Sequence, residues 1–196
     1  MLTHFTVTKM SKKQYSTLGL QILFWVLLMG TNTLLRASNS LVGVDYVDLD
    51  KFMGKWYVIA SIPTLLERDI FNAVETYQLR EDGTIATTFT FRKNGFDGQK
   101  KEYRPRGFVR NQKTNAVWGM QFIWPIKADY RIIYLDSGYK HTIIGRQKRD
   151  FVWLMAREST ISESSYQKLV ETVEKLGYDS SLLIRIPQRW PNESGN

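Results

Sequence analysis

Short segments with the composition of β-strands follow one another along most of the chain from Asp45 onward. Each is rich in β-branched or aromatic residues, or alternates apolar with polar positions, as half-buried strands do. Turn-forming residues, for example Glu81-Asp82-Gly83 and Asp136-Ser137-Gly138, separate the segments. The candidate strands are residues 56–62, 73–80, 84–92, 104–110, 116–122, 130–135, 139–145 and 151–157.

Eight strands joined mostly by short connections, with no helix between them, predict an antiparallel up-and-down meander. A sheet of this size can close into a β-barrel, or calyx, whose interior holds one small ligand. Closure also removes the exposed strand edges that an open sheet would leave. An open sandwich of two sheets is the alternative. The pattern favours an all-β fold, an eight-stranded antiparallel up-and-down barrel.

The hydrophobic period changes after the last candidate strand. Tyr166, Leu169, Val170, Val173 and Leu176 recur at helical spacing and form one apolar stripe. The residues before the stripe offer a capping box, with Thr160 and Glu163 three positions apart, or Ser162 as the cap. Gly177 follows at the expected end. We expect one C-terminal α-helix packed against the outside of the barrel.

The N-terminal 40 residues have the pattern of a secretory signal. Three lysines within residues 9–13 precede an apolar run over 18–29, and small residues follow at Ser38 and Ser40, where cleavage is expected. The alternative is a retained membrane anchor, although polar residues interrupt the apolar run before it reaches the length of a spanning helix. Translation from Met10 is a second open possibility, because Met10 stands just before the basic residues Lys12 and Lys13.

Composition narrows the function classes. The chain has 27 basic and 19 acidic residues, a formal net charge of +8, and no cysteine. Part of the positive charge belongs to the N-terminal segment, and the remainder is modest, so it suits an anionic membrane surface without requiring nucleic acid. The missing cysteines exclude disulfides, thiol nucleophiles and thiolate metal sites. We expect no metal, no cofactor and no nucleic-acid partner.

Three motifs occur in an order that resembles the lipocalin family. Gly54, Trp56 and Tyr57 form a Gly-x-Trp-Tyr start to the first strand. Residues 130–136 resemble the second signature, on the turn between the sixth and seventh strands. Arg157, at the end of the eighth strand, resembles the third. The chain looks most similar to bacterial outer-membrane lipocalins and their apolipoprotein-D-like relatives.

The resemblance implies a lipocalin domain over residues 41–196, following the signal or anchor segment over 1–40. It also implies a location in the periplasm or at the outer membrane, reached through the N-terminal signal, or membrane anchorage by that segment if it stays uncleaved. Typical bacterial members carry a lipid on a cysteine that this chain lacks. A monomer or a weak dimer is expected.

The signature residues imply a structural role at the closed end of the barrel. Arg157 and Trp56 are expected to meet there in a cation–π contact worth about 0.5–2 kcal/mol. Arg157 can also donate hydrogen bonds to backbone carbonyls of the N-terminal turn, which offsets the cost of burying its charge. Gly54 belongs to the same structural set.

Alternation along each strand, phased by the resemblance, predicts which side chains face the cavity. Residues nearest Trp56 are expected to be packed core, and those nearer the open end to touch ligand. The expected cavity residues are Val58, Ala60, Tyr77, Thr87, Phe89, Met120, Phe122, Tyr130, Ile132, Tyr134, His141, Ile143 and Trp153.

The resemblance implies binding and transport or storage of a small hydrophobic ligand such as a fatty acid or lysophospholipid, in membrane maintenance or stress response. A haem, pigment or siderophore-like ligand is the first alternative, and a filled barrel that contacts membranes is the second. The apolar run over residues 122–126 could form an exposed lip that dips into a membrane or closes over ligand, or it could pack at the barrel mouth.

The sequence offers little for catalysis, and we expect no enzyme. Motifs of serine hydrolases, P-loop proteins, dinucleotide-binding proteins and zinc proteases are all absent. Only His4 and His141 are available as imidazoles, which with no cysteine cannot build the common nucleophile or metal sets. A buried carboxylate pair that includes Glu75 is conceivable, but the sequence shows no partner for it.

Overall fold

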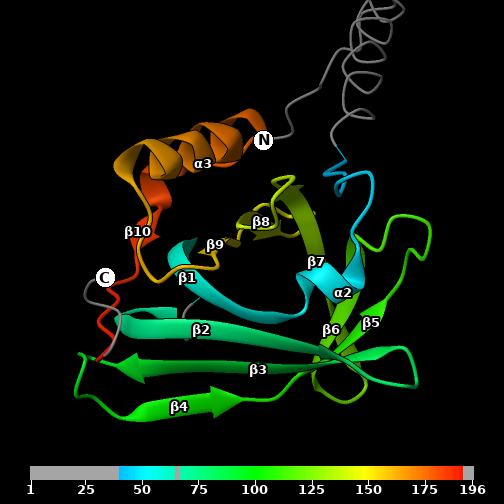
Figure 1. Cartoon of the computed structure of the whole chain (residues 1–196), viewed down its shortest axis with the longest axis horizontal. Helices are drawn as coiled ribbons and strands as arrows, with labels where there is room; N and C mark the ends of the chain where they lie inside the picture. The colour runs from blue at the N-terminus through cyan, green and yellow to red at the C-terminus, as the bar shows by residue number, and fades with distance from the viewer. Residues whose placement is uncertain (1–39, 65–66, 192–196) are drawn as a thin grey trace, which may run out of the picture. The chain divides into compact units, whose positions relative to one another are not determined.

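The computed structural model describes residues 40–64 and 67–191 (Figure 1). The expected signal or anchor segment, and the choice between Met1 and Met10 as the start, lie outside the described residues. Within them, no helix has the length and apolar character needed to cross a membrane.

The strands form one antiparallel sheet that closes on itself. Their bounds are β1 Gly54–Ile62, β2 Ile70–Leu79, β3 Thr84–Lys93, β4 Lys100–Tyr103, β5 Arg106–Val109, β6 Val117–Ile123, β7 Ile126–Leu135, β8 His141–Gly145, β9 Val152–Ala156 and β10 Ile184–Arg185. Neighbours pair in chain order, and pairing of β1 with β9 closes the barrel. The expected eight-stranded barrel is confirmed, with β4 and β5 together forming its fourth strand.

Two features modify the simple meander. The fourth strand is interrupted at Arg104 and Pro105, and both of its halves pair with β3. Pro105 has no N–H to donate, yet its carbonyl still accepts from Thr87 N at 3.2 Å, so the two halves stay aligned. The C-terminal segment then adds β10 beside Ala60 and Ser61 of β1.

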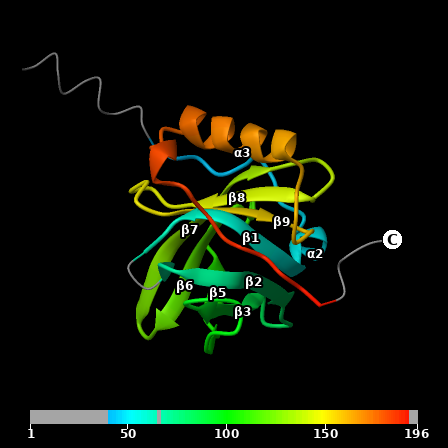
Figure 2. The same cartoon turned by 90° about the vertical axis from the view of Figure 1, so that its left-hand side faces the viewer.

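The expected helix is present as α3, Glu163–Lys175. Ser162 caps it, since its side chain accepts from Ser165 N, and Gly177 follows with a φ of +83°. Figure 2 shows α3 lying outside the barrel above β8. Its buried residues Tyr166, Leu169 and Val173 pack into a cluster with outward-facing residues of β1, β8 and β9.

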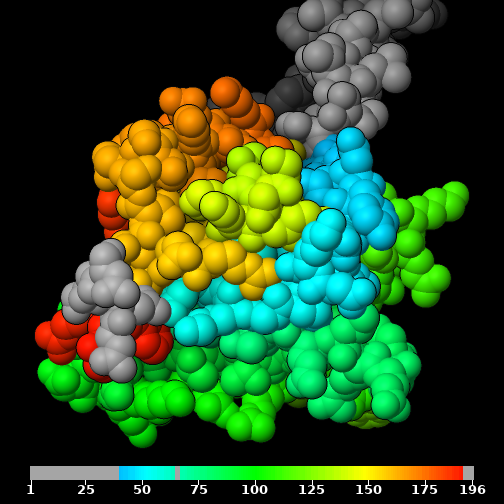
Figure 3. Space-filling view, viewed as in Figure 1, coloured from blue at the N-terminus to red at the C-terminus, as the bar shows by residue number. Residues whose placement is uncertain are grey.

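A second, larger apolar cluster fills part of the barrel interior. The short helix α2, Leu49–Phe52, contributes the fully buried Phe52 to it. Figure 3 shows the segment that contains α2, in cyan, lying against the strands. The chain therefore has an inner core within the barrel and an outer core between the barrel and α3.

Bulges decide which strand residues belong to which core. The register shifts between Val58 and Ala60 on β1, and between Ile132 and Tyr134 on β7. A bulge inserts one unpaired residue, so the residues beyond it face the opposite side from the one that simple alternation predicts.

Candidate ligand-binding pocket

One end of the barrel is closed by the expected pair of signature residues. The Arg157 guanidinium lies 3.8 Å from the centre of a Trp56 ring. It donates to the carbonyls of Lys51, Phe52 and Lys55 at 2.7, 3.0 and 2.8 Å. These contacts confirm that Arg157 stacks on the indole and ties the N-terminal turn to the end of the barrel.

The glycine of the first signature is required by the same arrangement. Gly54 has a φ of +92°, which side-chain-bearing residues rarely adopt, and a Cβ there would lie 3.4 Å from an Arg157 nitrogen. The Trp56 indole N–H meanwhile donates to the Phe52 carbonyl at 2.8 Å.

Aromatic side chains fill the interior next to this closed end. Trp118 and Tyr130 stack with their ring centres 5.4 Å apart, and Phe52 contacts Trp56, Tyr77 and Trp118. The buried hydroxyls of Tyr77 and Tyr130 share a hydrogen bond. This part of the barrel is packed core and leaves no room for ligand.

A cavity of about 460 Å³ occupies the other part of the interior. That volume lies within the usual range of ligand pockets. Most of its lining is aromatic. The residues that line it are Thr64, Glu67, Glu75, Phe89, Phe91, Tyr103, Met120, Phe122, Ala128, Asp129, Tyr130, Arg146, Phe151 and Trp153.

Five of the expected cavity residues line this pocket, namely Phe89, Met120, Phe122, Tyr130 and Trp153. Val58, Tyr77 and Ile132 belong to the inner core but do not line the pocket. Thr87 is buried with no hydrogen-bond partner for its hydroxyl in the described part of the chain, and it does not line the pocket either.

The remaining four expected cavity residues lie elsewhere. Ala60, Tyr134 and Ile143 belong to the outer core with α3, so the expectation that they face the cavity is not met. The bulges on β1 and β7 reverse Ala60 and Tyr134. On β8 the alternation begins one residue later than expected, so that Ile144 joins the inner core in place of Ile143. His141 is a partly exposed residue bonded to Asp136 at 2.7 Å.

Several pocket residues were not among those expected. Phe91 and Phe151 lie two positions from the expected Phe89 and Trp153, so continued alternation would have found them. Tyr103 and Glu67 come from the broken fourth strand and from the connection between β1 and β2. No periodic signal in the sequence marks either of them.

Two acidic side chains make the pocket electrostatically unusual. Burial raises the pKa of the Glu75 carboxyl well above its ordinary value, and the neighbouring Glu67 carboxylate raises it further. Burial also raises the pKa of Glu67, against the opposing effect of a hydrogen bond from Thr64 N at 3.3 Å. The carboxylate neighbour that the sequence did not reveal for Glu75 is therefore Glu67.

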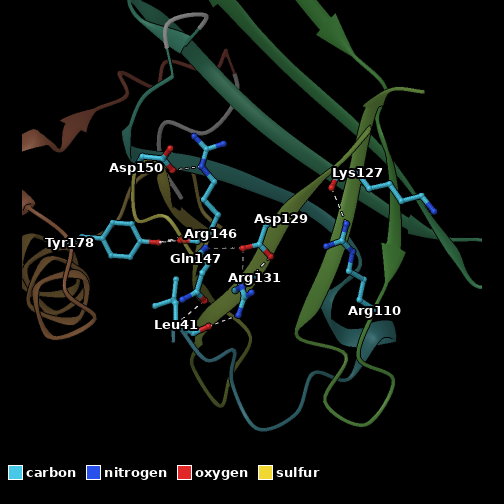
Figure 4. Close-up of polar contacts among 9 residues, drawn as sticks. All are labelled: Leu41, Arg110, Lys127, Asp129, Arg131, Arg146, Gln147, Asp150 and Tyr178. Carbon is cyan, nitrogen blue, oxygen red and sulfur yellow. Dashed lines mark hydrogen bonds and ion pairs between the residues drawn. The ribbon is translucent and has the colours of Figure 1, made fainter. Parts of the chain in front are cut away.

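The other charged residues of the lining already have partners of opposite charge. Figure 4 shows Asp129 held by Arg131, at 3.0 Å, and by the backbone N–H of Gln147, at 2.8 Å. Figure 4 also shows Arg146 paired with Asp150. The Arg146 guanidinium lies over the ring of Phe151. Within the described ranges, no cluster of three or more potential ligands could hold a metal ion.

Exposed apolar side chains continue from the pocket lining into the β6–β7 turn. Phe122 lines the pocket and is 55% exposed, and Ile123, Trp124 and Ile126 are 72%, 83% and 69% exposed. Of the two possibilities for this run, the structure thus shows the exposed one. We call these four residues the apolar turn.

A β-barrel closed at one end, with an apolar cavity inside and a helix outside, defines a calyx-type binding protein. The model of the lipocalin-like domain matches residues 47–188. The chain belongs to this lipocalin-like family, whose members bind small hydrophobic ligands and are generally binding or transport proteins. The resemblance seen in the three signatures is confirmed.

Relatives from a plant and a bacterium agree with this assignment. Temperature-induced lipocalin-1 of Arabidopsis thaliana is 32% identical over 151 residues, which is 74% of this chain and 81% of the relative. Outer membrane lipoprotein Blc of Escherichia coli is 28% identical over 145 residues, again 74% of this chain and 81% of the relative.

Solved structures show the same fold at low identity. Insecticyanin from the tobacco hornworm Manduca sexta superimposes with a TM-score of 0.60 at 14% identity, covering 76% of this chain and 84% of that one. The cockroach allergen Per a 4 gives 0.57 at 18% identity, covering 78% of this chain and 97% of that one.

Proposed function

We propose that this chain binds and carries a small hydrophobic molecule in the cavity above the Trp56–Arg157 base, and that it is not an enzyme. The observation that carries the proposal is the cavity of about 460 Å³, lined mainly by aromatic rings. A fatty acid or lysophospholipid fits such a cavity with its hydrocarbon chain inside and its polar end toward the apolar turn.

The expected affinity follows from the apolar area covered. Burying about 300 Å² of alkyl surface at about 25 cal/mol per Å² contributes roughly 7 kcal/mol. Immobilising the ligand costs several kcal/mol in return, so the natural expectation is a micromolar Kd.

The proposed location is the cell envelope, with the protein in the periplasm or at the outer membrane as a monomer or weak dimer. Support comes from the signal-like segment over residues 1–40 and from relatives named outer membrane lipoprotein in Escherichia coli and Vibrio cholerae. Because the chain has no cysteine to carry a lipid, the proposed alternative to a soluble form is anchorage by the uncleaved N-terminal segment.

Membrane contact through the apolar turn is a second proposed activity. Four large apolar side chains at the edge of a ligand pocket are costly to leave in water. Seated at a bilayer interface, they would place the pocket where lipid ligands enter and leave.

Native mass spectrometry of gently purified protein, together with displacement of a fluorescent fatty acid, tests the carrier proposal. The proposal predicts one bound lipid per chain and displacement at micromolar concentration. Absorbance of visible light by the purified protein would indicate that the bound ligand is a pigment or haem rather than a lipid. An empty protein with no displacement at tens of micromolar would refute the proposal.

A further inference from the structure

Glu75 is a buried acid that lines the ligand pocket. The residue lies on β2 and is 2% exposed, and its Oε2 has no hydrogen-bond partner in the part of the chain that the structure describes. Leaving a buried carboxyl oxygen unpaired destabilises the folded protein. A ligand that enters the pocket is therefore in a position to supply the missing partner.

The charges near Glu75 determine whether a positive or a negative ligand group fits beside it. Glu67 lies close enough to raise the pKa of Glu75 further, so a second acid faces the same space. Asp129 is paired with Arg131, and Arg146 is paired with Asp150 but also lowers the pKa of Glu67 in part. At Glu75 itself the acting charge is that of Glu67, so this end of the cavity favours a positive group over a carboxylate or a phosphate.

The aromatic lining is suited to the same kind of group. Phe89 lies across the β2–β3 pair from Glu75, and its ring centre is 4.8 Å from that of Trp153. Phe91 and Phe151 extend this set of rings, with centres 5.1 Å from Phe89 and Trp153 respectively. Ring faces attract ammonium groups, most strongly where water is excluded.

From the unpartnered Glu75, the nearby Glu67 and the surrounding rings, we infer that the pocket selects a cationic amphiphile, a hydrophobic amine whose ammonium group is buried against Glu75. This inference rests on the proposed carrier function, because it concerns the same cavity, and it narrows the class of ligand. On binding, Glu75 releases to solvent the proton that it keeps in the ligand-free protein, and the ammonium donates to the resulting carboxylate. The hydrocarbon part occupies the aromatic space toward the apolar turn. A fatty acid binds with its chain toward Glu75 and leaves that oxygen unpaired.

Three probes with the same chain and different ends test the inference: decylamine, decanol and decanoate. Their affinities are measured by calorimetry at neutral pH on the wild-type protein. A hydrogen bond to a charged group corresponds to about a 10- to 100-fold gain, so decylamine is expected to bind at least about tenfold more tightly than decanol. Decanoate is expected to bind no more tightly than decanol.

Glu75→Gln keeps the size of the side chain and removes its charge. The variant is expected to lose the preference for decylamine, so that decylamine and decanol bind it within about threefold of each other, and thermal unfolding shows separately that it is folded. Glu81→Gln, in the exposed turn after β2, is the matched control and should keep the full preference.

The outcomes distinguish failure of the amine inference from failure of the carrier proposal. If decanol and decanoate bind but decylamine shows no advantage, or if Glu75→Gln keeps the advantage, the amine inference is overturned and the carrier proposal stands. If none of the three probes binds, the carrier proposal fails and the inference fails with it. The comparison of decylamine with decanol on the wild-type protein tests the amine inference even if Glu75→Gln does not fold.

Discussion

At the scale of single residues, the half-buried Arg157 and the buried Glu75 are two ionisable groups in opposite surroundings. Arg157 stacks on an indole and donates to three carbonyls of the N-terminal turn, so its charge is compensated. Among the described residues, the Oε2 of Glu75 has no hydrogen-bond partner. The first arrangement belongs to a structural closure and the second to a site that still lacks its partner, and each makes a separate prediction.

Arg157→Lys is predicted to destabilise the barrel by about 2–3 kcal/mol. A lysine keeps the charge, but its ammonium cannot both stack flat on Trp56 and reach three carbonyls. Urea unfolding followed by tryptophan fluorescence measures the change. Arg104→Lys, at an exposed ion pair with Glu102, is the control and should change stability by less than about 0.5 kcal/mol. Equal effects of the two substitutions would contradict the structural role of Arg157.

Glu75 is predicted to make the ligand-free protein less stable as pH rises. Its pKa is raised in the folded state, so above the ordinary value of 4.5 the unfolded chain releases a proton that the folded chain keeps. Between pH 4.5 and the folded-state pKa of Glu75, the free energy of unfolding therefore falls by about 1.4 kcal/mol for each unit by which the pH rises. The pKa of Glu67 is also raised in the folded protein, so Glu67 likewise lowers the stability as pH rises.

Glu75→Gln should therefore show a flatter dependence of stability on pH than wild type. The variant gains stability relative to wild type between acidic and neutral pH, which thermal unfolding at a series of pH values measures. Parallel curves for the two proteins would show that Glu75 does not titrate as its burial requires.

At the scale of elements, the bulges and turns determine which side chains reach the ligand. The β7 bulge turns Tyr134 to the outer core beside Ile133, although the run from Ile132 to Tyr134 is apolar throughout. The β6–β7 turn presents its apolar residues to solvent beside the pocket, which predicts a membrane contact that can be removed without touching the ligand.

The double substitution Ile123→Ser and Trp124→Ser is predicted to weaken binding to vesicles of phosphatidylcholine and phosphatidylglycerol by about tenfold or more, because it removes much of the buried apolar area. Flotation or cosedimentation measures the binding. Leu182→Ser with Ile184→Ser, at exposed apolar positions near the C-terminal end, is the matched control and should have little effect. Equal losses in both variants would show that the apolar turn is not the contact.

At the scale of the whole molecule, the barrel and the external helix were predictable because each rests on a repeated local pattern. Alternation gave the strands, and the stripe from Tyr166 to Val173 gave α3. The break at Pro105 and the added β10 were missed, since neither carries a repeating pattern. The base was predictable because Trp56 and Arg157 lie in recognisable signatures.

The pocket was less predictable than the barrel that contains it. Alternation phased by the family resemblance found Phe89, Met120 and Trp153, whereas Ala60 was misplaced because the β1 bulge leaves no mark in a run of apolar residues. Glu67 belongs to a connection rather than a strand. Its position beside Glu75 depends on how the barrel closes, which is a property of the whole fold.

The most direct test of the account is a titration of a fluorescent fatty acid into three proteins: wild type, Ala128→Phe and Ala86→Phe. Ala128 lines the cavity, whereas Ala86 lies on β3 between the inward-facing Ile85 and Thr87 and is not part of the cavity lining. We predict one saturable site in wild type, an affinity at least about tenfold weaker when Ala128 is replaced by the larger ring, and no change at Ala86. Unchanged binding by Ala128→Phe would place the ligand outside the barrel and contradict the account.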